Sequence, residues 1–470
     1  MLFRSYAWKG YAMKKITGIV LMLFVLLTAA GCNGNTDQNS EITSETASQT
    51  TSSSMIEEIS TTETATIQNE QTAENTPETE TEAAPSEFKS NILKLNKKEL
   101  YDYEWSEEYG MALTELEFST IHLAGEDAER YPELAKALSK ECDLYEVNML
   151  EEHDILTENA KEMLLSGETD GFSPLVNRLD VHVRRADEVV LSILYDSYYY
   201  NGMNDGRRSF WGGNYDTETG SELHLPDVVT DIDKFAETVE TELFDTIGAD
   251  VIYSDTVIED YFKEYGADGT HWTLEYNGVT VYFDEGEIAG SGFGAINLTI
   301  EFAEYPELFK EKYIAVPETY IVGLPIKSTF YTDLDGDGHA DEISVVDSYD
   351  EENDYYATLY IYVPEVYYAE SFWAYACEPY YVKTTDGKNY MYVCTELETQ
   401  MYLHVYEITN STISKVGEAN VSPFYDNGIS TVLTDPNGMH FDIFSDEAGG
   451  GISEGNDFFS VGFDGMPAQG

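Results

Sequence analysis

The stretch Thr273-Leu274-Glu275-Tyr276-Asn277-Gly278-Val279-Thr280-Val281-Tyr282-Phe283 decides the fold class of this chain. Asn277-Gly278 is the strongest short signal for a β-hairpin, because both residues readily adopt the backbone angles of a tight turn. The residues on either side, 273–276 and 279–283, include several β-branched and aromatic side chains that favour strands. We therefore predict an antiparallel hairpin at this point.

Upstream of this hairpin, strand and helix periodicities follow one another. Phe235, Val239 and Leu243 recur at helical spacing, and Gly248 is placed to end that helix. The other segments with clear periodicity are predicted strands at about 116–120, 179–183 and 189–195, and a predicted amphipathic helix at about 128–165. Strands in pairs, with helices between them and no regular βαβ alternation, predict an α+β fold with a mixed α/β sandwich over residues 91–305.

This region also carries a family pattern. The runs Leu191-Ser192-Ile193 and Tyr198-Tyr199-Tyr200-Asn201-Gly202 precede a turn motif that contains Asp216, Thr219, Gly220 and Asp227. Together with 281–289 and 296–300, these runs resemble the RsiV-type extracytoplasmic domain over about residues 115–305. The family includes an anti-sigma factor whose outer domain binds lysozyme, and accessory domains beside cell-wall deacetylases. The resemblance implies a wall-facing module that binds a protein or is associated with glycans.

The turn motif has two interpretations. Asp216, Thr219 and Gly220 suit a tight turn after a strand, and Asp227 is placed near a helix start, so turn chemistry accounts for these residues. The alternative is direct contact with a ligand. The chain has Asn201-Gly202-Met203-Asn204 where the family tends to show Gly-Gly-Ala-His.

The N-terminal region predicts a bacterial lipoprotein. Lys14 and Lys15 precede an apolar run at 16–30, which ends in the lipobox-like stretch Leu27-Thr28-Ala29-Ala30-Gly31-Cys32. We expect a signal peptide at 1–31 and lipidation of Cys32, which would anchor the protein extracytoplasmically to the cell membrane. The alternative is a transmembrane anchor, but the run is shorter than the roughly 20 residues that span a bilayer.

Residues 32–90 are rich in Ser, Thr, Glu and Gln and poor in large apolar side chains, so we expect a disordered acidic tether. The chain as a whole has 89 acidic and 25 basic side chains and a formal net charge of −64. Such a charge repels nucleic acid and anionic lipid, which leaves the lipid anchor as the expected membrane contact. It favours a cationic protein or divalent cations as partners, although solubility alone also accounts for it.

Residues 306–470 are predicted to form a mostly antiparallel β domain. Its first turn contains Asp333, Asp335, Asp337, His339 and Asp341, and carboxylates at this spacing around Gly336 suit one Ca²⁺ ion. Because residues 343–346 read as a strand, the loop resembles the calcium loops of FG-GAP or VCBS-type repeats. An acidic β-turn without metal is the alternative. Related turns at Gly387 and Gly438 leave propeller-like blades and an open β-meander as possible arrangements.

A disulfide between Cys377 and Cys394 is also predicted. Residues 380–383 and 388–393 read as two strands, and a four-residue loop at 384–387 would place the two cysteines directly opposite each other.

The sequence contains none of the usual nucleophile or zinc-protease motifs, so a catalytic role has little support. Glu285 and Glu287 are the first pair to test if activity is found. The aromatic residues at 355–373 suit either strand packing or an exposed binding face. We therefore favour a non-catalytic surface lipoprotein that binds a cationic, lysozyme-like polypeptide or a cell-wall component. The alternative is a wall-glycan hydrolase or a deacetylase-associated enzyme that uses acidic residues.

Overall fold

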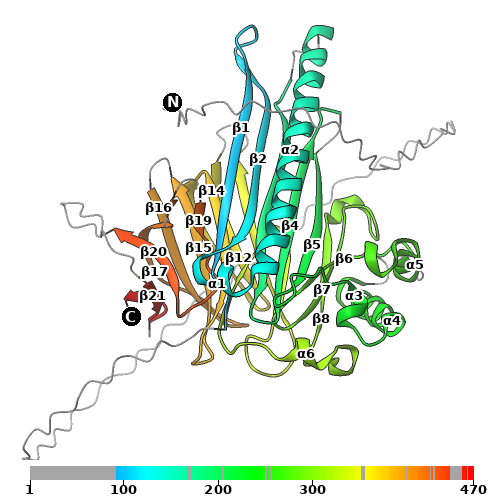
Figure 1. The fold of residues 1–470 in the computed structure, drawn as a ribbon, viewed down its shortest axis with the longest axis vertical. Coiled ribbons are helices and arrows are strands. Elements are labelled where there is room, and N and C mark those ends of the chain that lie inside the picture. Colours follow the sequence, from blue (N-terminus) through cyan, green and yellow to red (C-terminus); the bar gives the residue numbers. More distant parts are fainter. Residues whose placement is uncertain are drawn as a thin grey trace, which may run out of the picture. The chain divides into compact units, whose positions relative to one another are not determined.

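The computed structural model describes residues 91–469, apart from 168–170, 204–205, 249–250, 255–256, 351–354, 398–399, 424, 427–428, 445–457 and 463. The expected signal peptide, Cys32 and the expected tether lie outside these residues. Within the described part, no helix combines the length and the apolar character that crossing a membrane requires. The described residues form one compact unit (Figure 1).

A seven-stranded sheet forms the first part of this unit, with the strand order β18-β19-β1-β2-β3-β4-β5. β2 and β3 are parallel and the other neighbours are antiparallel. The strands are β1 (Leu95–Ser106), β2 (Met111–Leu123), β3 (Leu175–Ala186), β4 (Val190–Tyr200), β5 (Arg207–Asp216), β18 (Tyr425–Asp426) and β19 (Ile429–Thr431). Because β19 pairs with β1, strands from both sides of the expected boundary at 305/306 share this sheet.

Two helices connect β2 to β3: α1 (Gly125–Arg130) and the long α2 (Pro132–Ser166), which lies along one face of the sheet (Figure 1). The sequence predicted one helix from about residue 128. The structure has a break at Tyr131, since Pro132 suits the first turn of a new helix and cannot continue an old one. α2 ends at Gly167, which has a left-handed φ of 94°. Its buried side chains, Leu134 and Leu138 among them, pack on the sheet.

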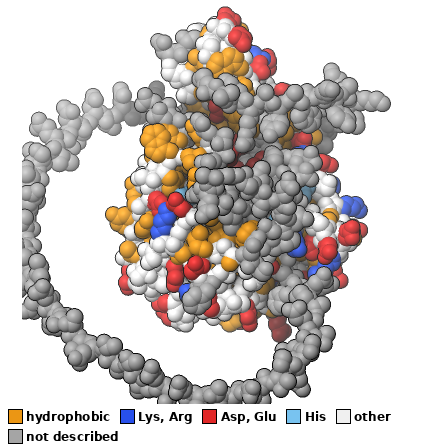
Figure 2. All heavy atoms as spheres, turned by 90° about the vertical axis from the view of Figure 1, so that its left-hand side faces the viewer, with side chains coloured by type: hydrophobic (Ala, Val, Ile, Leu, Met, Phe, Trp, Pro, Cys, Tyr) orange, Lys and Arg blue, Asp and Glu red, His pale blue; other side chains and the backbone are white. Residues whose placement is uncertain are grey.

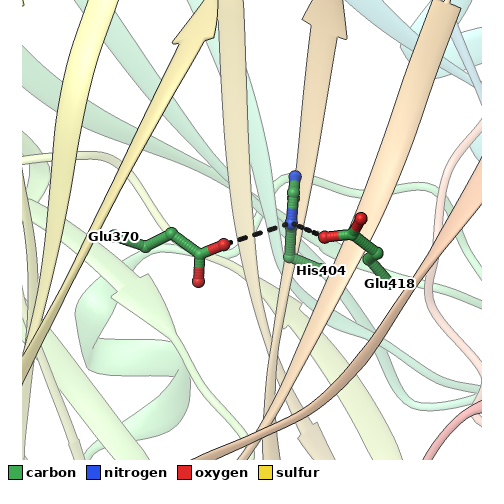
Figure 3. A group of neighbouring side chains, drawn as sticks. All are labelled: Glu370, His404 and Glu418. Atoms are coloured by element: carbon green, nitrogen blue, oxygen red, sulfur yellow. Dashed lines mark ion pairs between the residues drawn. The ribbon is translucent and has the colours of Figure 1, made fainter.

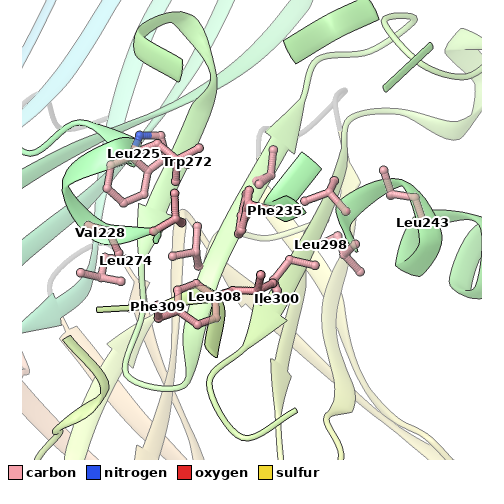
Figure 4. Packing of buried hydrophobic residues seen from close by; sticks show 14 of the residues in the cluster. Leu225, Val228, Phe235, Leu243, Trp272, Leu274, Leu298, Ile300, Leu308 and Phe309 are labelled. Atoms are coloured by element: carbon pink, nitrogen blue, oxygen red, sulfur yellow. The ribbon is translucent and has the colours of Figure 1, made fainter. Parts of the chain in front are cut away.

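A second layer consists of a three-stranded sheet covered by helices. The strands are β6 (His271–Leu274), β7 (Gly278–Phe283) and β8 (Ile296–Glu301), and the helices are α3 (Leu225–Val228), α4 (Ile232–Leu243) and α5 (Val257–Gly269). Phe235, Val239 and Leu243 form the predicted apolar stripe of α4 and are fully buried. Figure 4 shows Phe235 and Leu243 in this core. A π-helical turn, Phe244–Gly248, extends α4 to the glycine expected to end it.

The β6–β7 hairpin is present, but its turn lies one residue earlier than Asn277-Gly278. Leu274 pairs with Val279, and the backbone N–H of Glu275 donates to the carbonyl of Gly278 at 2.8 Å, so Tyr276 and Asn277 form the turn. Gly278 is required for another reason. A Cβ atom at this position would lie 2.3 Å from the carbonyl oxygen of Ile300 in β8.

The remaining strands form two facing antiparallel sheets. The four-stranded sheet has the order β10-β11-β12-β13, and the eight-stranded sheet has the order β22-β21-β20-β17-β16-β15-β14-β9. Their strands are β9 (Tyr320–Gly323), β10 (Thr329–Thr332), β11 (Asp341–Asp350), β12 (Tyr355–Val363), β13 (Val366–Ala374), β14 (Ala376–Lys383), β15 (Asn389–Leu397), β16 (Gln400–Ile408), β17 (Ile413–Pro423), β20 (Met439–Phe444), β21 (Phe458–Val461) and β22 (Pro467–Gln469). Ile343 and Ile361 from one sheet and Met391 from the other belong to the shared core.

Consecutive strands β14 to β17 are neighbours in their sheet, so this part is an open meander. The α+β class predicted from the sequence is confirmed: helices cover the first two sheets, and antiparallel strands dominate the rest.

A buried ion pair links three of the sheets. Arg184 on β3 donates to both carboxylate oxygens of Glu275, which follows β6, at 2.8 Å each. The same guanidinium donates to the carbonyl of Gly323 at the end of β9 at 2.7 Å. The side chains of Arg184 and Glu275 are 3% and 1% exposed. The first part of the chain and the C-terminal strands therefore share buried polar contacts as well as a sheet.

Candidate functional site

The predicted calcium loop joins β10 to β11, so it is followed by a strand as expected. The carboxylate of Asp333 accepts hydrogen bonds from the backbone N–H of Gly336 at 2.6 Å and of Gly338 at 3.0 Å. Asp341 closes the loop by accepting from the N–H of Leu334 at 2.9 Å. These bonds curl the backbone around the carboxylates.

Three of the four predicted carboxylate ligands converge. Asp333, Asp335 and Asp341 each offer an oxygen, and these oxygens lie within 4.8 Å of one another. The Asp337 carboxylate instead accepts from the N–H of His339 at 2.9 Å, and the ring of His339 contacts Glu304 at 2.6 Å. An all-oxygen cluster of this kind fits Ca²⁺, which takes carboxylate and carbonyl ligands at 2.3–2.6 Å.

Electrostatics around the loop reflect its crowded negative charge. Burial, with a further contribution from the neighbouring aspartates, raises the pKa of Asp341. Burial also raises the pKa of Glu301, at the end of β8, to about 7, and the charges of Glu304 and Asp333 act in the same direction. A bound cation would offset this repulsion.

The family turn motif has a structural role in the fold. Asp216 accepts from the backbone N–H and the hydroxyl of Thr219, at 2.9 and 2.8 Å. Gly220 has a φ of 64°, and a Cβ there would lie 2.5 Å from the backbone of Glu133, so the turn docks closely on the first turn of α2. Asp227 accepts from the N–H of His224 at 3.0 Å, at the start of α3. These contacts support the interpretation as turn chemistry.

The prediction that Cys377 lies opposite Cys394 is wrong. The β14–β15 hairpin has a five-residue loop, so Cys377 pairs with Thr395 and Glu378 pairs with Cys394. A shift of one residue turns a side chain to the other face of a sheet. Cys377 accordingly packs in the core between the two facing sheets, whereas Cys394 packs on the opposite face of the eight-stranded sheet. Both are free thiols.

The glutamate pair singled out for catalysis forms part of a turn. Glu287 accepts from the backbone N–H of Asp284 at 2.7 Å, and burial raises its pKa. This contact closes the loop after β7 and gives no indication of a catalytic arrangement with Glu285.

The aromatic residues of β12 and β13 divide between two faces. Tyr356, Tyr368 and Phe372 pack against the core between the facing sheets. On the outer face, Tyr355 stacks on Trp373 with ring centroids 4.5 Å apart, and Trp373 is largely exposed. Strand packing therefore accounts for the inward-facing residues, whereas Trp373 on the outer face is exposed.

A further exposed aromatic group, which the sequence reasoning missed, lies on the β1–β2 hairpin. Tyr101, Tyr103 and Trp105 alternate along β1 and are 63%, 39% and 45% exposed. Tyr101 pairs with Glu117 and Tyr103 with Glu115, so acidic side chains stand beside the rings on the same face. In the space-filling view, the protruding end of the molecule shows hydrophobic side chains next to carboxylates (Figure 2). The alternation of aromatic residues at 101–105 was the available signal.

The comparisons with known proteins give a likeness of fold. No family model matches the chain, and no curated protein matches it. Two solved structures of DUF3298 family proteins are similar to it, from Bacteroides fragilis (15% identity, TM-score 0.35) and from Pseudomonas aeruginosa (17% identity, TM-score 0.32). Each covers 48% of this chain, which spans 96% and 98% of theirs respectively.

Proposed function

We propose that this chain is a bacterial surface lipoprotein, anchored through lipidated Cys32, whose extracytoplasmic part binds a cationic polypeptide of the lysozyme type without catalysing a reaction. The observation that carries the proposal is the hairpin face defined by Tyr101, Tyr103, Trp105, Glu115 and Glu117. It combines exposed rings with carboxylates on a strand pair that extends beyond the rest of its sheet (Figure 1).

This combination suits a basic protein for two reasons. Carboxylates attract Lys and Arg side chains, as Glu117 already does with Arg178 at 2.9 Å, and the faces of exposed Tyr and Trp rings interact favourably with the same cations. The adjacent helix α2 adds to the field, because its 35 residues contain nine acidic and three lysine side chains, a difference of six negative charges. Aromatic residues are also the side chains most enriched at the centres of protein interfaces.

The second part of the proposal concerns calcium binding at the β10–β11 loop. We infer that one Ca²⁺ ion binds Asp333, Asp335 and Asp341, with Asp337 and the His339 carbonyl completing the set, as in FG-GAP or VCBS-type loops. Such an ion would fix the β10–β11 connection, and its role would be structural.

A binding assay with a matched control tests the proposal. The purified chain is immobilised, and lysozyme is passed over it at about 10 mM and about 150 mM salt, over which the screening length falls from about 30 to about 8 Å. We expect binding that weakens steeply with salt and is lost in Trp105→Ala and in Glu117→Gln. Trp373→Ala, on the outer face of β13, serves as the control and should bind normally.

Two outcomes would overturn it. Equal binding by the Trp105, Glu117 and Trp373 variants would place the interaction elsewhere. Binding of peptidoglycan fragments in place of lysozyme would identify a wall component as the ligand, and release of soluble products from those fragments would favour the enzymatic alternative.

A further inference from the structure

Three potential metal ligands meet between the two facing C-terminal sheets. Glu370 comes from β13, His404 from β16 and Glu418 from β17 (Figure 3). The Nδ1 atom of His404 lies 3.9 Å from Oε1 of Glu370 and 3.6 Å from Oε2 of Glu418. One ligand atom from each residue lies within 4.8 Å of the others.

His404 is held rigidly and points one nitrogen into this cluster. Its side chain is 8% exposed, its Nε2 atom lies 3.1 Å from the hydroxyl of Thr395, and Phe372 stacks on the ring at a centroid distance of 5.2 Å. Nδ1 is buried, and within the described residues it makes no hydrogen bond. Burial of polar nitrogen without a partner is costly, so this atom calls for an explanation.

The chemical character of the three groups supplies one. Nδ1 of His404 faces the carboxylates of Glu370 and Glu418, while Nε2 lies against the hydroxyl of Thr395. When Nε2 donates to Thr395, the lone pair of Nδ1 faces two carboxylates. In that tautomer three electron-pair donors converge, and a cation bound between them would stabilise the group.

Lys415 already compensates part of this charge. Its Nζ atom lies 2.5 Å from Oε1 of Glu370 and 2.9 Å from Oε2 of Glu418, the same two oxygens that face His404. The ammonium satisfies the carboxylates but leaves Nδ1 without a partner. Lys415 has a long flexible side chain that is 27% exposed, so it is able to leave towards solvent.

We propose that Glu370, His404 and Glu418 bind a divalent first-row metal ion of the zinc type, and that Lys415 is the counter-charge that the ion displaces. Imidazole selects such metals over Ca²⁺, which distinguishes this centre from the all-oxygen calcium loop. Two ligands bound to zinc at 2.0–2.2 Å in tetrahedral geometry lie roughly 3.4 Å apart, so the observed 3.6 and 3.9 Å require only a small closure.

The surroundings resemble those of other metal centres. The hydroxyl of Tyr406 donates to the second oxygen of Glu370 at 2.8 Å, which orients that carboxylate, while Thr395 orients the imidazole. Glu418 is 55% exposed, which leaves a path for the ion and a position for a water ligand. Three protein ligands with an open fourth position are typical of accessible zinc centres.

The test uses the purified full chain, stripped with chelator and titrated with Zn²⁺ in a calorimeter. We expect a saturable site whose affinity falls roughly tenfold or more in His404→Gln and in Glu418→Gln. Glu418 is half exposed, so its variant keeps the packing intact if His404→Gln misfolds. Glu407→Gln, also on β16 and outside the cluster, is the matched control and should bind as the wild type does.

The direction in which Lys415→Gln changes the Zn²⁺ affinity distinguishes a competing ammonium from a supporting residue. Removal of a competing ammonium should tighten Zn²⁺ binding, whereas loss of a supporting residue would weaken it. Bound Co²⁺ should show visible absorption bands that disappear in Glu418→Gln. Unchanged Zn²⁺ affinity in both ligand variants, or weaker binding in Lys415→Gln, would overturn the proposal. Asp335→Ala in the calcium loop should leave the zinc affinity unaltered.

Discussion

Replacing Arg184 by methionine should destabilise the whole described unit, because this side chain joins three sheets. The guanidinium holds both oxygens of Glu275 and the carbonyl of Gly323, and both charged groups are almost completely buried. Removing one partner leaves the other charge buried and uncompensated. Such losses typically cost about 3–5 kcal/mol of folding free energy.

The contacts around Glu275 narrow the expected cost of Arg184→Met. The hydroxyls of Thr273 and Thr280 donate to Glu275 at 3.0 Å each, and these bonds partly support the carboxylate after Arg184 is gone. The carbonyl of Gly323 loses the hydrogen bond that Arg184 donates, which adds a smaller cost. We therefore expect about 3–4 kcal/mol for Arg184→Met. The double variant Arg184→Met/Glu275→Met should lose less than Arg184→Met alone, because it removes both charges.

Urea unfolding followed by circular dichroism and tryptophan fluorescence measures these costs. Lys234→Met is the control, because its pair with Glu307 is about half exposed on both sides and screened by solvent, so its loss should change the free energy of unfolding little. Both probes should report one shared transition. A cost of Arg184→Met below about 1 kcal/mol, or an additive double variant, would refute the reasoning.

Four further predictions concern the calcium loop, one buried carboxyl group, the anchor and the thiols. Calcium at about 1 mM should stabilise the chain by about 0.4–1.4 kcal/mol for a Kd of 10⁻⁴–10⁻³ M, and Asp335→Ala should abolish this gain. Melting curves that are identical with calcium and with chelator would contradict it. The folded pKa of Glu301 is raised to about 7, so the fold favours the protonated form of this carboxyl group. Its contribution to the free energy of unfolding is therefore present at low pH and is lost as the pH rises towards 7. Glu301→Gln should flatten the fall in stability between about pH 5 and 7, and an unaltered slope in denaturant titrations would count against it. Cys32→Ala should prevent lipidation and release the protein or hold it as precursor in fractionated cells, whereas processed, membrane-bound protein would contradict the anchor. Thiol labelling of denatured, unreduced protein should now find Cys377 and Cys394 reactive together with Cys142, and a protected pair would instead indicate a disulfide.

Local periodicity was sufficient to predict elements but not the register between them. The spacing of Phe235, Val239 and Leu243 is a property of one helix, and all three are buried as predicted. Pairing depends on the length of the connecting turn, and the sequence gives this length only approximately. The β6–β7 turn moved by one residue, which shifts each partner by two positions and preserves the faces.

An error in the predicted register of the β14–β15 hairpin overturned the disulfide prediction. One additional loop residue shifts each partner by one position, and that shift alone sends Cys377 and Cys394 to opposite faces. The cluster around His404 was hidden for a related reason. His404 pairs with Glu418 only because an irregularity between Val405 and Tyr406 changes the register of β16 and β17. Glu370 lies on β13 of the other sheet, so its spacing from His404 along the chain could not indicate that the two side chains are neighbours.

The imbalance between 89 acidic and 25 basic side chains connects these sites. Several of the few basic groups are committed to buried pairs inside the fold, as Arg184 is to Glu275 and Arg185 to Asp187. Few basic side chains are left to pair with carboxylates that converge elsewhere, and Lys415 forms ion pairs with two of them, Glu370 and Glu418. External cations would neutralise such clusters without protonating the carboxylates. They would be a calcium ion at the β10–β11 loop, a first-row metal ion at His404, and a basic polypeptide at the hairpin face. Salt separates the three: screening should weaken the polypeptide contact first, because coordinated ions bind through short, directed bonds that dissolved salt screens far less.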